Sequence, residues 1–355
     1  MDNIRRLSFK GQHFYVGLDV SKKSWKTCIL TRDFEHKMFS QPPHAEVLGQ
    51  YLRRHFPDAT YHCVYEAGYF GFWIHDELLN QGINCVVVNP ADIPTRHKEH
   101  RRKTDKVDAR KLARNLRTGE IDPIFVPAPE FLEDRTLIRI RLGYSKKLTR
   151  CKNQIKALLQ FHGVHLPSEL TDRYWSRRYI SWLQQKHLSR PSGNSALATL
   201  VEELLFLRKT ILLLTRQIRQ LAQQPQYHQN YKNLISIPGI GPLSAMTLLT
   251  EIVDISRFET SDFLAGFAGL VPDEHSTAEK QTITQMTKRR NPSMRKILIE
   301  ASWMAVQKDP ALMHKFNLLT KRMSKQRAII RIARKLLNRI RFVLINQCPY
   351  KPLTL

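Results

Sequence analysis

Four acidic residues lie at positions where the folded chain could bring their carboxylates together. Asp19 and Glu66 each come at the end of an apolar run of the kind that forms a strand. Asp105 and Asp108 are three residues apart in a segment with helical spacing, so both fall on one face of a helix. Hard divalent cations prefer oxygen ligands, and two Mg²⁺ ions can support in-line cleavage of a phosphodiester. The four carboxylates are therefore candidate catalytic residues that bind Mg²⁺, with room for a two-metal site.

The Asp105–Asp108 pair also has a plainer interpretation. Basic residues surround it, and ion pairs three and four residues apart on an ordinary amphipathic helix would use the same side chains. The joint placement of carboxylates on two strands and a helix favours the metal site, because it is the arrangement of ribonuclease-H-like nucleases. The basic neighbours are then candidate nucleic-acid contacts: Arg101, Arg102, Lys103, Lys106 and Arg110.

Charge and composition favour a polyanionic partner. The chain has 355 residues, with 57 Lys and Arg against 31 Asp and Glu, a formal net charge of +26. Such an excess attracts phosphate backbones, so we expect DNA or RNA binding; a merely soluble basic protein is the alternative. The five cysteines are widely spaced without a Cys-x-x-Cys pair, which is typical of a reducing compartment. No apolar run approaches the roughly 20 residues that span a bilayer. We therefore expect a cytoplasmic, nucleoid-associated protein with no membrane contact.

The chain is predicted to have three parts. Residues 1–125 show strand and helix patterns and predict a mixed α/β catalytic domain. Residues 126–228 contain two long stretches with Leu and Ile at intervals of three and four, which predict long helices. These helices can pair antiparallel within one chain or form a coiled coil between subunits, and we expect dimerisation through them. Residues 229–347 predict a mostly helical domain. The predicted fold class is thus α/β followed by α.

The third part carries two further candidate nucleic-acid-binding features. Gly239 and Gly241 occupy a turn between two helical patterns, where glycine lets backbone N–H groups approach a phosphate. This segment resembles the helix-hairpin-helix motif of non-specific DNA binders, with a plain αα-hairpin as the alternative. From Ser276 to Arg341 basic residues far outnumber acidic ones. The candidate contacts in this region are Lys288, Arg289, Arg290, Arg295 and Lys296.

Seven segments together resemble the Piv/MooV-type insertion-sequence transposases, the insertion-sequence one-ten family and its one-eleven-eleven subgroup. They are residues 17–25, 65–73, 86–99, 101–113, 234–258, 264–277 and 287–312. The resemblance implies a RuvC-like DEDD domain at the N-terminus and a transposase domain at the C-terminus. It implies a DNA recombinase guided by a structured non-coding RNA, the bridge RNA, that acts as a tetramer, a dimer of dimers. Asp19, Glu66, Asp105 and Asp108 would hold Mg²⁺, while a serine of the C-terminal domain attacks DNA and forms a 5′-phosphoserine.

The sequence departs from the family pattern at this nucleophile. The family has a Ser-Ser-Gly-like run, whereas this chain has Ser276, Thr277 and Ala278. Thr277 occupies the nucleophile's place when the run is counted from Pro272, and Ser276 stands just before it. We favour Ser276, with Thr277 or an impaired copy as alternatives. Three other functions stay open: a RuvC-like nuclease or Holliday-junction resolvase that uses water, a site-specific invertase of the same family, and a non-enzymatic packaging protein.

Overall fold

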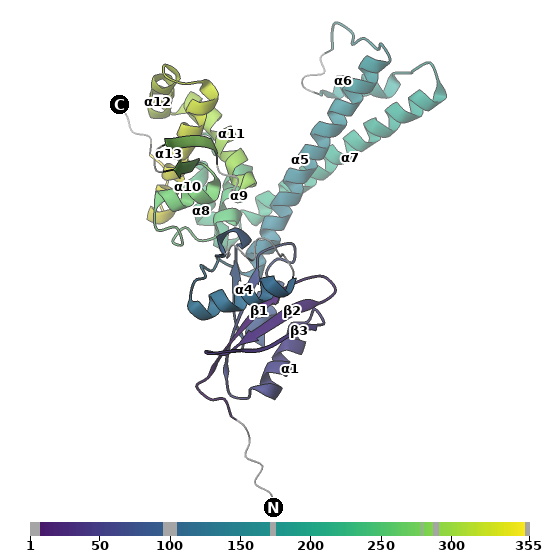
Figure 1. The fold of residues 1–355 in the computed structure, drawn as a ribbon. Helices are drawn as coiled ribbons and strands as arrows, with labels where there is room; N and C mark the ends of the chain where they lie inside the picture. Colours follow the sequence, from purple (N-terminus) through teal and green to yellow (C-terminus); the bar gives the residue numbers. More distant parts are fainter. Residues whose placement is uncertain (1–7, 95–104, 171–174, 278–279, 287–290, 352–355) are drawn as a thin grey trace, which may run out of the picture. The chain divides into compact units, whose positions relative to one another are not determined.

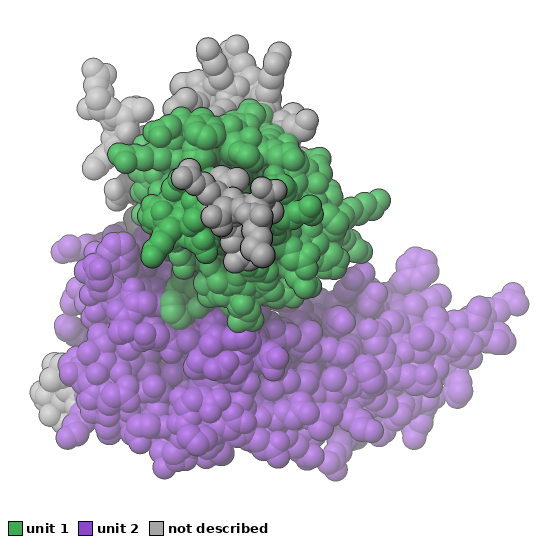
Figure 2. All heavy atoms as spheres, turned by 90° about the horizontal axis from the view of Figure 1, so that it is seen from below, with its two compact units in different colours: residues 1–126 green, residues 127–355 purple. Residues whose placement is uncertain are grey.

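The computed structural model describes the backbone of residues 8–94, 105–170, 175–277, 280–286 and 291–351. Side chains are described for the same residues except 105–106, 272–277 and 280–286. The chain divides into two compact units, residues 1–126 and 127–355 (Figure 2). The predicted three-part division stays a prediction.

The first unit is built on a five-stranded mixed sheet with the order β3-β2-β1-β4-β5 (Figure 1). Strands β1 (His13–Asp19), β2 (Trp25–Leu30) and β3 (Glu35–Gln41) form an antiparallel meander. Strand β4 (Thr60–Glu66) runs parallel to β1, and β5 (Asn84–Val88) runs parallel to β4. The predicted α/β class of this unit is thereby confirmed.

Helices cover both faces of this sheet. Apolar residues of α1 (Ala45–His55) and α2 (Trp73–Asn80) pack with Phe14, Val16 and Leu18 on one face. The other face receives α4 (Asp105–Thr118), whose alanines pack on β2 and whose Leu112 packs against Val64. A short 3₁₀ helix, η1 (Pro90–Asp92), follows β5. Because successive residues of a strand point to opposite faces, each strand contributes one set of residues to each layer.

The sequence patterns did not reveal β3 and α1. Strand β3 is an edge strand whose residues are largely exposed and polar, so it lacks the apolar alternation that marks a strand. The backbone pairing with β2 therefore makes this segment a strand, although its sequence has no strand pattern. Helix α2 ends at Asn80, and Gly82 just beyond it lies in the left-handed region at φ +77°, a conformation that glycine adopts readily.

The second unit begins with two long helices, α5 (Pro129–Phe161) and α7 (Pro191–Leu221). They run antiparallel, since Arg141 donates to the Thr215 hydroxyl and the Cys151 thiol to the Leu200 carbonyl. Figure 1 shows the pair as an arm with α6 (Arg177–Gln185) at its far end. The two long helices therefore pair with each other within one chain, which was the alternative to a coiled coil between subunits.

The helices in the remainder of the second unit pack around one apolar core. This remainder contains α8 (Pro225–Ile235), α9 (Pro242–Ile252), α10 (Ser261–Ala268), the hairpin of β6 (Pro272–Thr277) and β7 (Lys280–Met286), α11 (Pro292–Lys308), α12 (Pro310–Thr320) and α13 (Lys325–Asn346). Buried aliphatic residues of α9, α11 and α13 form the centre of that core. Among the described residues, no helix has the length and apolar character needed to cross a membrane.

Candidate active site

Asp19 and Glu66 lie at the carboxyl ends of two neighbouring parallel strands. Leu18 of β1 pairs with Tyr65 of β4, and each acidic residue is the next one along its strand. Both side chains are half-buried. The parallel register therefore brings these two carboxylates to the same edge of the sheet, as their sequence contexts predicted.

Their side chains belong to the face of the sheet that α4 covers. Two residues before Glu66, Val64 packs with Leu112 of α4. Two residues before Asp19, Gly17 lies directly under the backbone of α4. Because a strand repeats every two residues, Asp19 and Glu66 point to this same side.

Asp108 reaches that edge from α4. The ammonium of Lys111 lies 3.7 Å from Asp108 Oδ1 and 3.9 Å from Glu66 Oε1. Lys111 is buried, while the side chains of Glu66 and Asp108 are 33% and 22% exposed. The Lys111 ammonium thus lies between the Glu66 carboxylate at the end of β4 and the Asp108 carboxylate on α4. We call Asp19, Glu66, Asp108 and Lys111 together the carboxylate site.

Asp105 is the first residue of α4, and its side chain lies outside those described. Its backbone position, one turn before Asp108, is the one that the spacing predicted. Among the side chains that the structure describes, no group of three or more His, Cys, Asp or Glu residues is arranged to hold a metal ion. The oxygen donors of the carboxylate site are nevertheless those that Mg²⁺ prefers, so their chemistry fits this ion.

Of the basic residues predicted to contact phosphate near α4, Arg110 alone has a side chain that the structure describes. Arg110 makes two hydrogen bonds to Glu35 of β3, at 2.7 and 2.9 Å, and this pairing raises the pKa of its guanidinium. Its charge is therefore already matched within the unit. The positions of Arg101, Arg102 and Lys103, and the side chain of Lys106, lie outside the described part of the chain.

The candidate nucleophiles lie near the tip of the β6–β7 hairpin. Ser276 pairs with Gln281 and Thr277 with Lys280 in an antiparallel register. Only residues 278–279 separate the two strands. The side chains of the hairpin are outside those described, so the choice between Ser276 and Thr277 stays a prediction. Lys288, Arg289 and Arg290 likewise lie outside the described residues.

The two glycines between α8 and α9 have different surroundings. Gly239 has φ +93°, and a Cβ atom there would lie 2.4 Å from the Ala301 carbonyl oxygen of α11. Close packing against α11 therefore accounts for this glycine without a ligand. Gly241 is the N-cap residue of α9 and has no atom within 4 Å of a built Cβ. Gly241 is thus the better candidate for a backbone approach to phosphate.

Arg295 and Lys296 both lie in the first half of α11. Lys296 is 54% exposed and forms an ion pair with Glu300, 3.7 Å away. Arg295 is half-buried and makes interactions within the protein. Of the two, Lys296 is the residue with a surface position suited to a phosphate.

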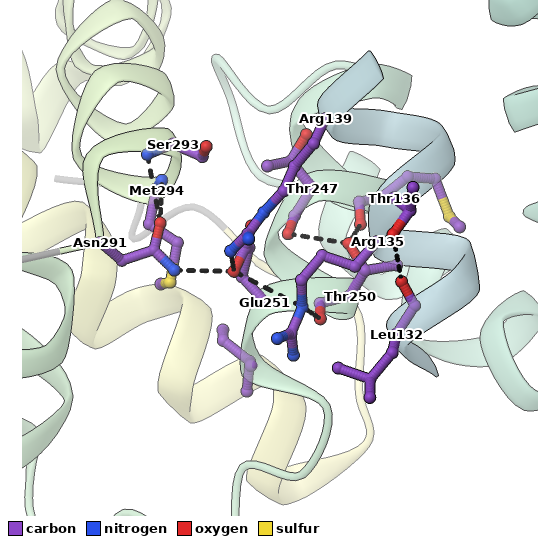
Figure 3. A network of polar contacts seen from close by, with 12 residues as sticks. Leu132, Arg135, Thr136, Arg139, Thr247, Thr250, Glu251, Asn291, Ser293 and Met294 are labelled. Atoms are coloured by element: carbon purple, nitrogen blue, oxygen red, sulfur yellow. Dashed lines mark hydrogen bonds and ion pairs between the residues drawn. The ribbon is translucent and has the colours of Figure 1, made fainter. Parts of the chain in front are cut away.

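A buried polar network between α5, α9 and the start of α11 was not predicted from the sequence. Glu251 at the end of α9 is 2% exposed, and Arg139 of α5 binds both of its carboxylate oxygens at 2.8 Å (Figure 3). Arg135 lies 3.6 Å away, and the Asn291 amide donates to the same carboxylate at 2.7 Å. Burial lowers the pKa of Arg135, while Glu251 opposes that shift.

Asn291 connects this network to the start of α11. Its side-chain oxygen accepts from the backbone N–H groups of Ser293 and Met294 and so caps α11. The chain leaves β7 at Met286, shortly before this cap. The one signal in the sequence was a single acidic residue, Glu251, at the end of an otherwise apolar helical pattern.

Comparisons with known proteins identify the family of this chain. Residues 16–163 match the DEDD transposase model of the IS110 family, and residues 231–317 match the model described as Transposase IS116/IS110/IS902 family. The protein y4qE of Sinorhizobium fredii, named as a transposase, is 33% identical over 297 residues, which are 81% of this chain and 71% of that protein.

Two further relatives extend the likeness. The transposase for insertion sequence element IS1533 of Leptospira borgpetersenii is 27% identical, across 81% of this chain and 84% of its own length. The pilin gene-inverting protein of Moraxella lacunata is 26% identical, across 74% of this chain and 73% of its own length. The carboxylates at Asp19, Glu66 and Asp108 fall inside the DEDD match. The chain therefore belongs to the IS110 family of insertion-sequence transposases, enzymes that cut and rejoin DNA.

Proposed function

We propose that this transposase is an RNA-guided recombinase that cuts and rejoins DNA through a covalent serine or threonine intermediate. The carboxylate site carries the proposal: Glu66 and Asp108 lie within 4 Å of one ammonium, at the strand edge that also bears Asp19. The sheet order, with a three-strand antiparallel meander and two parallel strands beside it, supports a RuvC-like, ribonuclease-H-like domain.

Asp19, Glu66, Asp105 and Asp108 are the residues that would hold Mg²⁺. When bound, Mg²⁺ would supply positive charge for a phosphodiester whose negative charge grows during reaction. The protein's own part is to gather carboxylates from β1, β4 and α4 at one edge. Carboxylates gathered in this way repel one another, and this repulsion favours a divalent cation among them.

The covalent step conserves the energy of the phosphodiester. The hydroxyl oxygen of Ser276, or of Thr277, forms a new bond to phosphorus while the bond from phosphorus to the 3′ oxygen breaks. The hydroxyl proton leaves with a base, and the 3′ oxygen leaves as a hydroxyl after gaining a proton. A new 3′ hydroxyl then attacks the 5′-phosphoserine and releases the side chain. Each bond broken is matched by one formed, so rejoining needs no further energy source.

A guide RNA and a multimer complete the proposal. The net charge of +26 suits an RNA as well as a DNA partner, and base specificity would then come from pairing with the RNA. On helix α7, Leu205, Phe206, Leu212 and Leu213 are large apolar residues that are 38–59% exposed. Leu205 and Leu212 are seven residues apart, as are Phe206 and Leu213, and this heptad spacing is typical of a coiled coil. A second subunit would cover them, in a dimer or a dimer of dimers, in the cytoplasm next to the nucleoid.

A trapping experiment tests the chemistry. Purified protein is incubated with Mg²⁺, 5′-labelled and 3′-labelled donor DNA and the RNA encoded beside its gene, then denatured and separated by size. The fragment downstream of the cut keeps the 5′-phosphate and stays attached to the protein. We therefore expect the protein to carry the label of the 3′-labelled strand and not that of the 5′-labelled strand. Ser276→Ala should remove the adduct, and Thr277→Ala should leave it.

The possible results separate the candidate functions. An adduct that disappears in Thr277→Ala alone would assign the nucleophile to Thr277. Cut DNA without any adduct would replace the proposal by a water-using nuclease or resolvase. An adduct that forms equally well without RNA would contradict RNA guidance. In Asp108→Asn we expect DNA binding without adduct, and unchanged strand exchange in that variant would contradict the metal site.

Site-specific inversion is the second candidate, and the likeness to the pilin gene-inverting protein favours it. The proposed chemistry is the same, because inversion and transposition differ in the arrangement of the two DNA sites. A plasmid assay with two sites in inverted orientation tests it. Inversion products would support it, and excision products alone would favour transposition.

A further inference from the structure

We propose that Lys111 is a positioning residue that holds the carboxylate site together before a divalent cation binds. This inference rests on the metal site of the proposed function. It assigns a role to a residue that is neither a metal ligand nor a nucleophile, and that acts through Glu66 and Asp108.

The distances around Lys111 are the first support. Its ammonium lies 3.7 Å from Asp108 Oδ1 and 3.9 Å from Glu66 Oε1, so it stands between two carboxylates from different elements. Both distances are longer than the roughly 2.7–2.9 Å of a direct charge-assisted hydrogen bond. The ammonium therefore attracts both carboxylates through its charge, without a short hydrogen bond to either.

Burial is the second support. Lys111 is only 8% exposed, although lysine is almost never buried unless it is paired. Its neighbours along α4, Ala109, Leu112 and Ala113, are buried in the layer between helix and sheet. The stem of Lys111 is thus confined, and ordering its ammonium costs less entropy than it would at the surface.

The electrostatic consequence is specific. Without a metal, Lys111 offsets repulsion among the carboxylates and so stabilises the folded unit. With a metal, the same positive charge repels the ion. Removing the charge of Lys111 should therefore destabilise the metal-free protein and at the same time strengthen its affinity for Mg²⁺. A residue with only a packing role would destabilise both forms equally.

Thermal unfolding with and without metal separates these two roles. The full-length protein, Lys111→Met and Asn115→Ala are heated in the presence of a chelator and of saturating MgCl₂. Asn115 is the matched control, because it is a buried polar residue of the same helix. Its side-chain amide donates a hydrogen bond to the Pro94 carbonyl. Its variant also identifies the transition that belongs to the first unit.

We expect Lys111→Met to unfold about 5 °C below the parent protein in chelator, the shift that removing one or two ionic interactions produces in a domain of this size. Mg²⁺ should return most of that difference, so that the Mg²⁺-induced rise of Lys111→Met exceeds that of the parent by about 4 °C. Asn115→Ala should unfold earlier under both conditions and show the parent's Mg²⁺-induced rise. Adding Asp108→Asn to Lys111→Met should restore part of the stability in chelator, because it removes one repelling charge.

Two different failures can be told apart. An equal Mg²⁺-induced rise in Lys111→Met and in the parent would overturn the positioning role and leave the metal site intact. If Mg²⁺ raises the unfolding temperature of none of the proteins and calorimetric titration of the parent detects no binding, the metal site of the proposed function is itself wrong, and the role of Lys111 with it.

Discussion

Gly17 and Ala109 are so close to each other that a Cβ atom built on Gly17 would lie 2.1 Å from the Ala109 carbonyl oxygen. This close approach seats α4 on the central strand of the sheet. It also sets how far Asp108, one residue before Ala109, stands from the strand edge that carries Asp19. The glycine two residues before the first acidic residue is thus a structural requirement of the carboxylate site.

We expect Gly17→Ala to displace α4 and abolish DNA cleavage. Overpacking of a close approach costs about 1–3 kcal/mol, and here the obstructing atoms are backbone atoms, which cannot rotate away. Urea unfolding and the adduct assay measure the two effects. Gly143→Ala in α5 is the control, because its Cβ would meet no atom within 4 Å, and it should be neutral or slightly stabilising. A fully active Gly17→Ala would show that the helix does not set the carboxylate geometry.

The glycines of the α8–α9 turn should respond differently to alanine. Gly239→Ala should destabilise the second unit by about 2 kcal/mol or more, because φ +93° and the Ala301 carbonyl both exclude a Cβ. Gly241→Ala should cost less, about 0.5–1 kcal/mol, because alanine is a poorer N-cap residue than glycine. If the Gly241 backbone binds a phosphate, its variant should also bind DNA more weakly under conditions in which it is fully folded. Unchanged DNA affinity in Gly241→Ala would remove this turn from the interface.

Glu251→Gln should destabilise the second unit strongly. The substitution removes the negative charge shared by Arg135 and Arg139, and breaking a buried ion pair costs about 3–5 kcal/mol. Glu300→Gln is the control, since its pair with Lys296 is exposed and such pairs contribute about 0–1 kcal/mol. Urea denaturation of both variants gives the comparison. Equal effects would mean that the Glu251 network contributes little.

Asp309 should make stability depend on pH. Burial alone would raise its pKa, but the Leu312 N–H, the Tyr350 hydroxyl and Arg339 outweigh burial and hold the pKa below its ordinary value. A depressed folded-state pKa means that the ionised Asp309 stabilises the protein above the unfolded-state pKa of about 3.9. This stabilisation is lost as the pH falls through the lower, folded-state pKa.

The difference in unfolding free energy between the parent and Asp309→Asn should therefore be largest near neutral pH and shrink below about pH 4. Unfolding curves at a series of pH values measure it. Asp262→Asn, in an exposed pair with Arg334, should differ from the parent by no more than about 1 kcal/mol at any pH. A pH-independent difference for Asp309→Asn would mean that the interaction it removes is not ionic.

Helix α13 offers a test of the basic surface. Arg327, Arg331 and Lys335 are exposed at intervals of four residues and so form one stripe, whereas Arg334 pairs with Asp262. Removing one side chain that binds a phosphate should reduce the log–log salt dependence of DNA affinity by about 0.9. Arg331→Gln should show that reduction, and Arg334→Gln should not. Identical salt slopes for Arg331→Gln and the parent would place the DNA elsewhere.

The sequence by itself determined the elements and the kinds of chemistry available. The apolar runs before Asp19 and Glu66 became adjacent strands, and the three-residue spacing of Asp105 and Asp108 became the first turn of α4. The Leu and Ile stripes became α5 and α7. These features follow from local periodicity, because the repeat of two residues in a strand and 3.6 in a helix determines which side chains share a face.

The tertiary structure decided which charges meet. Arg110 and Lys111 are adjacent basic residues of one helix, yet one pairs with Glu35 on an exposed edge and the other is buried between Glu66 and Asp108. Glu251 gave no strong signal in the sequence, and only the packing of α5, α9 and α11 makes it the centre of a network. Such partnerships join residues far apart in the chain, and they depend on how helices and sheet pack, which local spacing does not encode.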